Sequence, residues 1–114
     1  MITLYHNPRC SKSRLTLALL REHNIEPDIV LYLEQRIDGE QLQAILDKLG
    51  CKPRALLRRS EEDYKRLGLK NPDLSDQRLL QAMLDYPKLM QRPIAVRGER
   101  AAIGRPPENV LELL

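Results

Sequence analysis

The chain has 114 residues, 42% of them hydrophobic, and its 19 Lys and Arg against 16 Asp and Glu give a formal net charge of +3. This length and composition predict one folded domain and exclude a disordered chain. The charge is too mild and too evenly spread to indicate nucleic-acid binding, and no apolar stretch approaches the ~20 residues of a membrane span, so we expect neither nucleic acid nor membrane as a partner.

The beginning of the chain predicts a β-α-β unit. Residues 2–5 predict a short strand, and residues 11–23 predict a helix, because apolar side chains recur there at helical spacing. Asn24 is a plausible residue to end that helix. Residues 28–33 are apolar and partly β-branched, which predicts a second strand.

The middle of the chain predicts helices only. Asp38 is expected to cap a helix over residues 39–49, which Gly50 ends. The other helices are predicted over residues 54–59 and 61–67, and from a Ser75-Asp76 cap to Leu84.

The end of the chain predicts a hairpin and a helix. Residues 94–97 and 100–103 predict two strands, joined by a tight turn at Gly98-Glu99. A short helix is expected over residues 108–114, after Pro106-Pro107.

This order of elements is β-α-β, then helices, then β-β-α. It predicts an α/β protein with the thioredoxin-like plan of a four-stranded mixed sheet. We expect a single domain over residues 1–114, with a helical insertion at roughly 35–90.

Cys10 lies between the first strand and the first helix, in the run His6-Asn7-Pro8-Arg9-Cys10-Ser11-Lys12-Ser13-Arg14. The N-terminus of a helix carries partial positive charge and unpaired N–H groups, which favour a thiolate and bind oxyanions. Three cationic side chains in the run add to that charge. The pattern predicts a nucleophilic sulfur that meets an anion. The alternative is an inert buried cysteine, and Pro8 and the charged flanks argue against burial.

Ser13 and His6 are candidate partners of the sulfur. Ser13 stands where a dithiol redox protein has its second cysteine, so a thiol from another molecule must regenerate Cys10. The Ser13 hydroxyl either donates a hydrogen bond to the thiolate or satisfies a backbone N–H in the first helical turn. His6 either stabilises the thiolate as a cationic imidazole or is a structural histidine at a strand end. Cys51 lies at a helix end, where nothing else indicates chemistry.

The guanidinium group of arginine binds tetrahedral oxyanions through paired N–H donors. Two arginines of the chain precede prolines, in Arg92-Pro93 and Arg105-Pro106. An Arg-Pro pair just before a strand is where a thioredoxin-like fold carries a cis-proline beside its active cysteine. Spacing alone does not separate these arginines from the others in the chain. No metal-ligand spacing and no glycine-rich nucleotide loop is present, so we expect no metal and no bound cofactor.

The N-terminal residues have no basic region followed by a long apolar segment, so we expect no secretion signal. Two cysteines are too few for a disulfide framework. We therefore expect a reducing, cytoplasmic location.

Five segments, spread from end to end of the chain, share their order with a known family. They are Tyr5-His6-Asn7-Pro8-Arg9-Cys10-Ser11-Lys12-Ser13-Arg14, Leu31-Tyr32-Leu33-Glu34, Arg54-Ala55-Leu56-Leu57-Arg58, Arg92-Pro93-Ile94 and Gly104-Arg105-Pro106-Pro107. In these segments the chain resembles the ArsC family of glutaredoxin-linked arsenate reductases, and most closely its short bacterial branch.

The resemblance implies a thioredoxin-like fold with a helical insertion, and Cys10 as the nucleophile that attacks arsenate. The residues implied to lower the pKa of that nucleophile are His6 and Ser13. The residues implied to bind the oxyanion are Arg58, Arg92 and Arg105, with Asn7 and Arg14 supporting the loop and the anion. Glutathione is implied to attack the arsenic adduct, and glutaredoxin to resolve the mixed disulfide, after which arsenite leaves.

Two other functions remain open at this stage. An Spx-like regulator would share the fold and bind RNA polymerase without turnover, although Ser13 replaces the second cysteine of the usual switch. A related thiol enzyme would use glutathione on another substrate.

Overall fold

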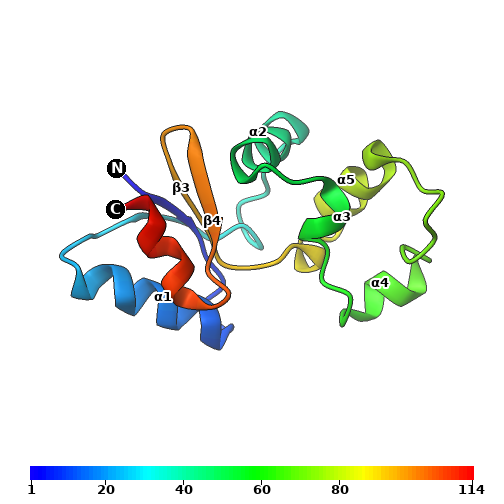
Figure 1. Ribbon diagram of the computed structural model, residues 1–114. Coiled ribbons are helices and arrows are strands. Elements are labelled where there is room, and N and C mark those ends of the chain that lie inside the picture. Colours follow the sequence, from blue (N-terminus) through cyan, green and yellow to red (C-terminus); the bar gives the residue numbers. More distant parts are fainter. The chain divides into compact units, whose positions relative to one another are not determined.

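Four strands form one mixed sheet in the order β2-β1-β3-β4 in the computed structural model, which describes all of residues 1–114 (Figure 1). The strands are β1 (Thr3–Tyr5), β2 (Asp28–Val30), β3 (Ile94–Arg97) and β4 (Arg100–Ile103). β1 pairs parallel with β2 and antiparallel with β3, and β3 and β4 form an antiparallel hairpin. The predicted thioredoxin-like fold class is therefore confirmed.

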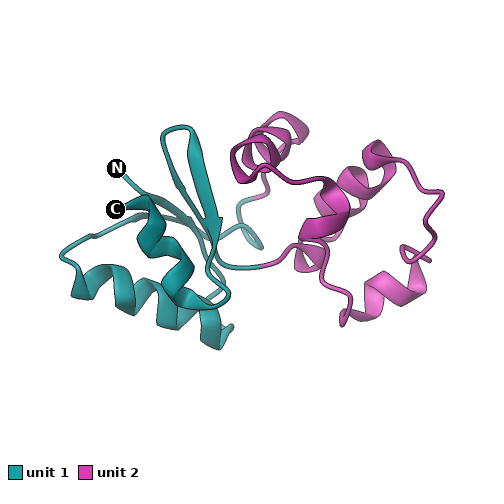
Figure 2. Cartoon of the chain, in the orientation of Figure 1, with its two compact units in different colours: residues 1–35, 92–114 teal, residues 36–91 magenta.

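The chain divides into two compact units, coloured separately in Figure 2. The first unit comprises Met1–Gln35 and Arg92–Leu114, and it contains the sheet, helix α1 (Ser11–Glu22) and the 3₁₀ helix η2 (Pro107–Leu113). The second unit comprises Arg36–Gln91 and is helical. The pairing of β1 with β3 joins the two ends of the chain into the first unit.

The core of the first unit is built on one face of the sheet. Leu4 of β1 lies opposite Ala95 of β3, and Ala95 lies opposite Ala102 of β4, so the three side chains form a row across the sheet. Leu20 of α1 and Val110 of η2 belong to the same buried cluster. Alternate residues of a strand point to opposite faces, which is why α1 and η2 cover this face.

The second unit consists of α2 (Gly39–Leu49), α3 (Pro53–Leu56), α4 (Glu62–Arg66), α5 (Asp76–Asp85) and the 3₁₀ helix η1 (Pro87–Leu89). α5 packs against α2, α3 and η1. Asp38 and Gln41 form a capping box at the start of α2, and Gly50 ends that helix with φ 68°. Ser75 caps α5 by accepting the N–H of Arg78.

Three elements differ from the sequence prediction. The strand predicted over 28–33 ends at Val30, because β1 ends at Tyr5 and the Leu31 carbonyl accepts hydrogen bonds from the turn that follows. The helix predicted over 54–59 is Pro53–Leu56, because Leu57 forms a β-bridge with Met90 instead of continuing it. The final helix is 3₁₀ rather than α.

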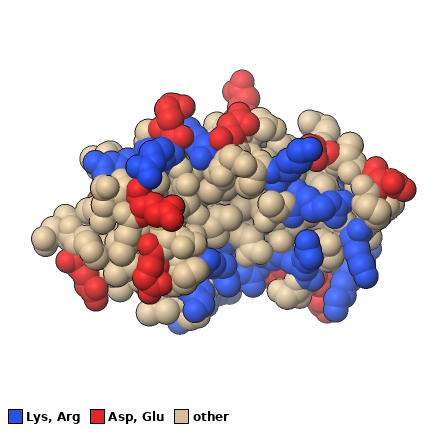
Figure 3. Space-filling model, in the orientation of Figure 1, with Lys and Arg blue, Asp and Glu red and all other residues tan.

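The surface carries charges of both signs, and Lys, Arg, Asp and Glu side chains all occur on the face shown in Figure 3. None of the helices is both long enough and apolar enough to cross a membrane.

Gly104 follows β4 and lies where no side chain fits. A Cβ atom there would be 2.6 Å from Oγ1 of Thr16 and 2.8 Å from Cγ of Pro93. The Gly104 N–H donates to the Pro93 carbonyl oxygen over 2.9 Å, which fixes the same close approach from the backbone side. Gly104 thus lets the chain after β4 lie against both α1 and the Arg92-Pro93 segment.

We expect Gly104→Ala to lower the free energy of unfolding by about 1–3 kcal/mol, the usual cost of overpacking a close contact. Urea unfolding of the purified variant measures this. Gly39→Ala is the matched control, because its Cβ would make an ordinary 3.6 Å contact with Leu84; it should leave stability unchanged or raise it by up to about 1 kcal/mol. Equal stability of Gly104→Ala and wild type would contradict the close packing.

Candidate active site

Cys10 is the N-cap residue of α1, with an extended backbone at φ −94° and ψ 124°. Its N–H donates to the Asn7 carbonyl oxygen over 3.0 Å, and its own carbonyl oxygen accepts the Arg14 N–H over 3.0 Å. These bonds fix the sulfur at the positive end of a 12-residue helix. The placement of the cysteine at the junction of strand and helix is the one that the sequence predicts.

Burial and hydrogen bonding act in opposite directions on the Cys10 thiol. Burial raises its pKa, whereas the backbone N–H of Ser13, the side chain of Arg92 and the backbone N–H of Lys12 donate hydrogen bonds that lower it, and the charge of Arg92 lowers it further. The net result is a pKa below that of an ordinary thiol. The site therefore favours the thiolate, which is the nucleophilic form.

Cys10 is more buried than the sequence predicts. Only 9% of its surface is exposed, although Pro8, Arg9 and Lys12 around it are exposed. The argument that charged flanks keep the cysteine open was wrong, because Cys10 is buried although its neighbours Pro8 and Arg9 are exposed.

Two arginines of the first unit meet at the sulfur. Arg105 donates from Nη2 to Cys10 Sγ over 3.5 Å and from Nε to the Arg92 carbonyl oxygen over 2.8 Å. Because Arg92 also donates to the sulfur, one guanidinium holds both the thiol and the backbone of the other arginine. The two cations are thus fixed next to the sulfur, where they could bind an anion.

Both arginines precede a cis peptide bond, at Arg92-Pro93 and Arg105-Pro106. The predicted cis-proline before β3 is confirmed, and the second one, after β4, was not predicted. The Gly104 bond to Pro93 joins the two Arg-Pro segments to each other.

Ser13 is fully buried and organises the loop rather than the sulfur. Its hydroxyl oxygen lies 2.6 Å from Nδ1 of His6 and accepts the Asn7 N–H over 3.0 Å. The backbone N–H of Ser13, not its hydroxyl, donates to Cys10. The hypothesis that the hydroxyl bonds the thiolate is therefore replaced by one in which it positions the loop.

His6 is buried, and burial lowers its pKa, with the charges of Arg21 and Arg14 lowering it further. The imidazole is therefore neutral at neutral pH, and the expected cationic imidazole beside the thiolate was wrong. The physical reason is that burial disfavours the charged ring, and the charged groups that act on His6 are themselves cations. What His6 provides is the hydrogen bond to Ser13.

Asn7 and Arg14 hold the loop before α1. The side-chain oxygen of Asn7 accepts the Arg9 N–H over 3.0 Å, and Nη1 of Arg14 donates to the Pro8 carbonyl oxygen over 2.9 Å. The structure thus gives both residues a loop-supporting position, and a direct contact of Arg14 with an anion stays a prediction.

Arg58 and Cys51 belong to the second unit. Arg58 follows α3, and its Nε lies 3.9 Å from Oε1 of Glu61, while its N–H donates to the Leu89 carbonyl oxygen. Its part in oxyanion binding stays a prediction. Burial raises the pKa of Cys51, so this half-buried cysteine is a protonated thiol at neutral pH.

Asn109 is a positioning residue that sequence reasoning missed. Its Nδ2 donates to the carbonyl oxygens of Ile103, over 3.2 Å, and Arg105, over 3.1 Å. These bonds hold the segment that carries Arg105 to the first turn of η2. The sequence signal that could have indicated this role is an Asn two residues after Pro107, because Asn side chains commonly bond the backbone around turns.

The sequence model of the ArsC family matches residues 5–113. The chain belongs to the ArsC family. A relative from Haemophilus influenzae named arsenate reductase is 48% identical over 99% of this chain and 98% of its own length. One from Escherichia coli with the same name is 42% identical over 99% of this chain and 80% of its own length.

Among solved structures, the arsenate reductase from Vibrio cholerae resembles this ArsC chain with a TM-score of 0.96 and 48% identity, over 99% of this chain and 97% of the other.

We expect the stability of this ArsC protein to fall as the pH drops below about 6.5, the ordinary pKa of histidine. The folded-state pKa of His6 is lower, so the unfolded chain takes up a proton first and is favoured as the pH falls. Urea unfolding at pH 7, 6 and 5 measures this. His6→Asn should flatten the dependence. If the stability of wild type and of His6→Asn changed with pH in parallel, the lowered pKa of His6 would be contradicted.

We expect Ser13→Ala to cost about 1–3 kcal/mol of stability, because the Asn7 N–H and His6 are left buried without their partner. The pH at which Cys10 becomes half alkylated should change little, because the Ser13 N–H remains. Thermal unfolding and iodoacetamide labelling measure the two effects. A clear rise in the pKa of Cys10 in this variant would instead give the hydroxyl a direct role at the sulfur.

Proposed function

We propose that this protein reduces arsenate to arsenite, with Cys10 as the nucleophile and with glutathione and glutaredoxin as the source of electrons. The observation that carries the proposal is the Cys10 sulfur with a lowered pKa, held by Arg105 over 3.5 Å and by Arg92. Membership of the ArsC family and the names of the relatives support arsenate as the substrate.

In the first step, arsenate binds against the guanidinium groups of Arg92 and Arg105. These cations offset the repulsion between the anion and the thiolate, which would otherwise keep two negative groups apart. Cys10 attacks As(V), a S–As bond forms, and one As–O bond breaks. The oxygen takes up protons from solvent and leaves as water.

In the second step, the thiol of glutathione attacks the arsenic and displaces another oxygen as water. A glutaredoxin thiolate then attacks the glutathione sulfur. The new S–S bond oxidises these two sulfurs, and the electron pair of the broken As–S bond stays on arsenic and reduces it to As(III). Water finally replaces Cys10 on As(III), so arsenite leaves and the thiolate is regenerated.

External thiols are required in this scheme because Ser13 occupies the position where a neighbouring resolving cysteine would stand. Cys51, the other cysteine, is held protonated by burial and lies in the second unit. We assign Arg58 as a third oxyanion-binding residue on the strength of its family motif. Dependence on glutathione also fits a cytoplasmic location.

The test is steady-state arsenate reduction by purified wild type with glutathione and glutaredoxin. Cys10→Ser should abolish arsenite formation, while Cys51→Ser should keep the wild-type rate because its thiol takes no part. Arsenite formation by Cys10→Ser, or none by wild type with both thiols present, would contradict the proposal. Tight binding of RNA polymerase without turnover would favour a regulatory role instead.

We expect Arg92→Lys to lower kcat/KM for arsenate about 5- to 150-fold, which corresponds to about 1–3 kcal/mol of transition-state stabilisation. Lysine keeps the positive charge but lacks the paired N–H donors of the guanidinium group. Arg97→Lys is the matched control, because Arg97 ends β3 and its side chain bonds the Leu113 carbonyl oxygen instead. Unchanged kinetics of Arg92→Lys would remove Arg92 from the site.

A further inference from the structure

A pocket of about 480 Å³ lies in the second unit, where α4 ends. Three cations and no acidic residue line this α4 pocket, whose wall is formed by Arg59, Tyr64, Lys65, Gly68 and Lys70. A pocket of this size falls in the range of small-molecule sites. None of the steps proposed above uses it.

The end of α4 builds this pocket from residues that a longer helix would separate. Lys65 and Lys70 are five residues apart, and in a continuous helix they would point roughly 140° apart around the axis. Instead, Gly68 adopts a left-handed conformation with φ 65° and reverses the chain. Its N–H donates to the Lys65 carbonyl oxygen over 3.1 Å, and the Leu69 N–H donates to the Tyr64 carbonyl oxygen over 3.0 Å. The turn therefore lets both lysines line the same pocket.

The segment after this turn is held in place by α3. Arg54 donates from Nη1 to the Leu69 carbonyl oxygen over 2.9 Å and from Nη2 to the Asn71 carbonyl oxygen over 2.8 Å. The backbone on either side of Lys70 is therefore fixed. Nothing lies within 4 Å of the position that a Cβ atom of Gly68 would take, so the space beside the turn is open.

The acidic side chains at the start of α4 do not neutralise the pocket. Asp63 accepts from Nη2 of Arg66 over 2.8 Å, and Oε1 of Glu61 lies 3.9 Å from Nε of Arg58. Glu62 does not line the pocket. The three cations in the wall form no ion pair with the chain. Their positive charge is left without a counterion from the protein, and such a concentration of one charge attracts an anion.

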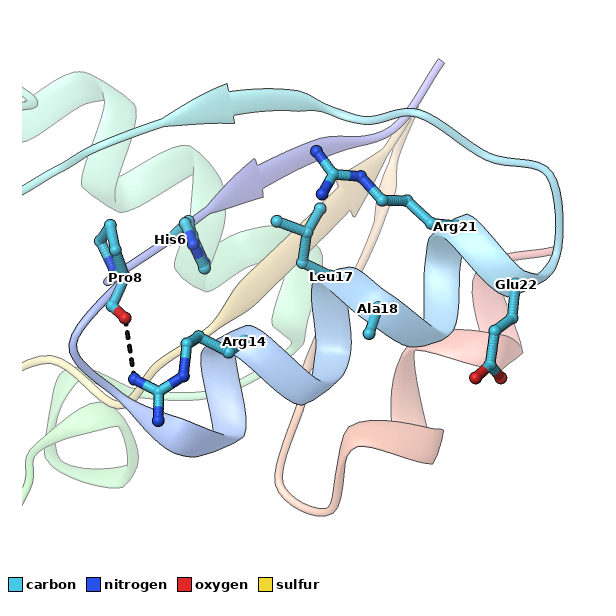
Figure 4. A pocket seen from close by; sticks show the side chains of 7 residues that line it. All are labelled: His6, Pro8, Arg14, Leu17, Ala18, Arg21 and Glu22. Carbon is cyan, nitrogen blue, oxygen red and sulfur yellow. Dashed lines mark hydrogen bonds between the residues drawn. The ribbon is translucent and has the colours of Figure 1, made fainter.

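The groove along α1 in the first unit differs in this respect (Figure 4). It is larger, at about 700 Å³, but both of its arginines are engaged. Arg21 bonds the two carboxylate oxygens of Glu26 over 2.9 and 3.0 Å, and Arg14 donates to the Pro8 carbonyl oxygen over 2.9 Å, the bond drawn in Figure 4. Glu22 adds a negative charge to the wall. An anion would meet competition there that the α4 pocket lacks.

We propose that the α4 pocket binds the diphosphate group of a small molecule. A phosphate monoester carries about −1.5 to −2 charges at neutral pH, so three cations match more than one phosphate group. The guanidinium of Arg59 suits paired phosphate oxygens, and the two lysines bind phosphate as point charges. All five residues of the wall belong to the second unit, and none has a part in the proposed arsenate reduction. The inference therefore does not depend on that function.

The test is a titration of isotope-labelled protein with inorganic pyrophosphate, followed through the backbone N–H signals in NMR spectra. Saturable shifts are expected at Gly68 and Lys70. Lys70→Gln should raise the Kd at least fivefold. The matched control Lys52→Gln removes the same charge from the same unit outside the pocket, and it should keep the Kd within twofold of wild type.

Two results of this titration would overturn the proposal. One is an equal Kd for Lys70→Gln and wild type. The other is a set of shifts confined to residues 10–13, because pyrophosphate would then bind only at the active site.

Two further probes identify what carries the diphosphate group. ADP should bind at least fivefold more tightly than pyrophosphate if the ligand is a nucleotide, because the nucleoside then adds contacts with the wall. ADP should bind equally or more weakly if the ligand is pyrophosphate itself. Inorganic phosphate at the same ionic strength should bind at least tenfold more weakly than pyrophosphate. Equal binding of phosphate and pyrophosphate would overturn the diphosphate assignment, because it would show an unspecific anion site.

Discussion

The ionisation of one sulfur depends on a balance between burial and hydrogen bonding. Only 9% of Cys10 is exposed, and burial by itself favours the neutral thiol. The backbone N–H groups of Ser13 and Lys12 at the start of α1 and the guanidinium group of Arg92 bring the pKa below its ordinary value, and Arg105 adds a hydrogen bond to the sulfur over 3.5 Å. The same burial that opposes the charge also strengthens each of these hydrogen bonds, since little water competes for the donors. Remote parts of the first unit contribute to the chemistry to the extent that they keep these donors in place.

The fold brings those donors together from three places in the sequence. The helix N-terminus comes from the β1–α1 junction, and each arginine comes from an Arg-Pro segment next to β3 or β4. The pairing of β1 with β3 places the first two beside each other, and the Gly104 and Asn109 bonds fix the third. Few of these contacts are strong alone, but they share partners, so the loss of one loosens several.

Much of the fold follows from local patterns in the sequence. The hairpin at 94–103, the Asp38 cap and the order of strands and helices were predictable, because turn and capping residues act over a few positions. The end of β2 and the early end of α3 were not, because a carbonyl of Leu31 and a bridge from Leu57 to Met90 depend on chain folded elsewhere. At the site, the position of Cys10 could be predicted, whereas the neutral His6 and the backbone role of Ser13 could not. Both depend on the folded surroundings: burial and the charges of Arg21 and Arg14 at His6, and the Asn7 N–H at the Ser13 hydroxyl.

The most direct test of this account is the ionisation of Cys10 itself. The thiolate absorbance of Cys51→Ser at 240 nm against pH, less that of the Cys10→Ser, Cys51→Ser double variant, follows Cys10 without the contribution of the four tyrosines. The same pair of proteins unfolded in urea supplies the reference for an ordinary thiol. The account predicts that the pKa of Cys10 is clearly lower in the folded protein than in the unfolded one. It also predicts that Arg92→Lys raises the folded-state pKa toward the unfolded value. A folded value equal to or above the unfolded value would contradict the account, because burial would then outweigh the donors.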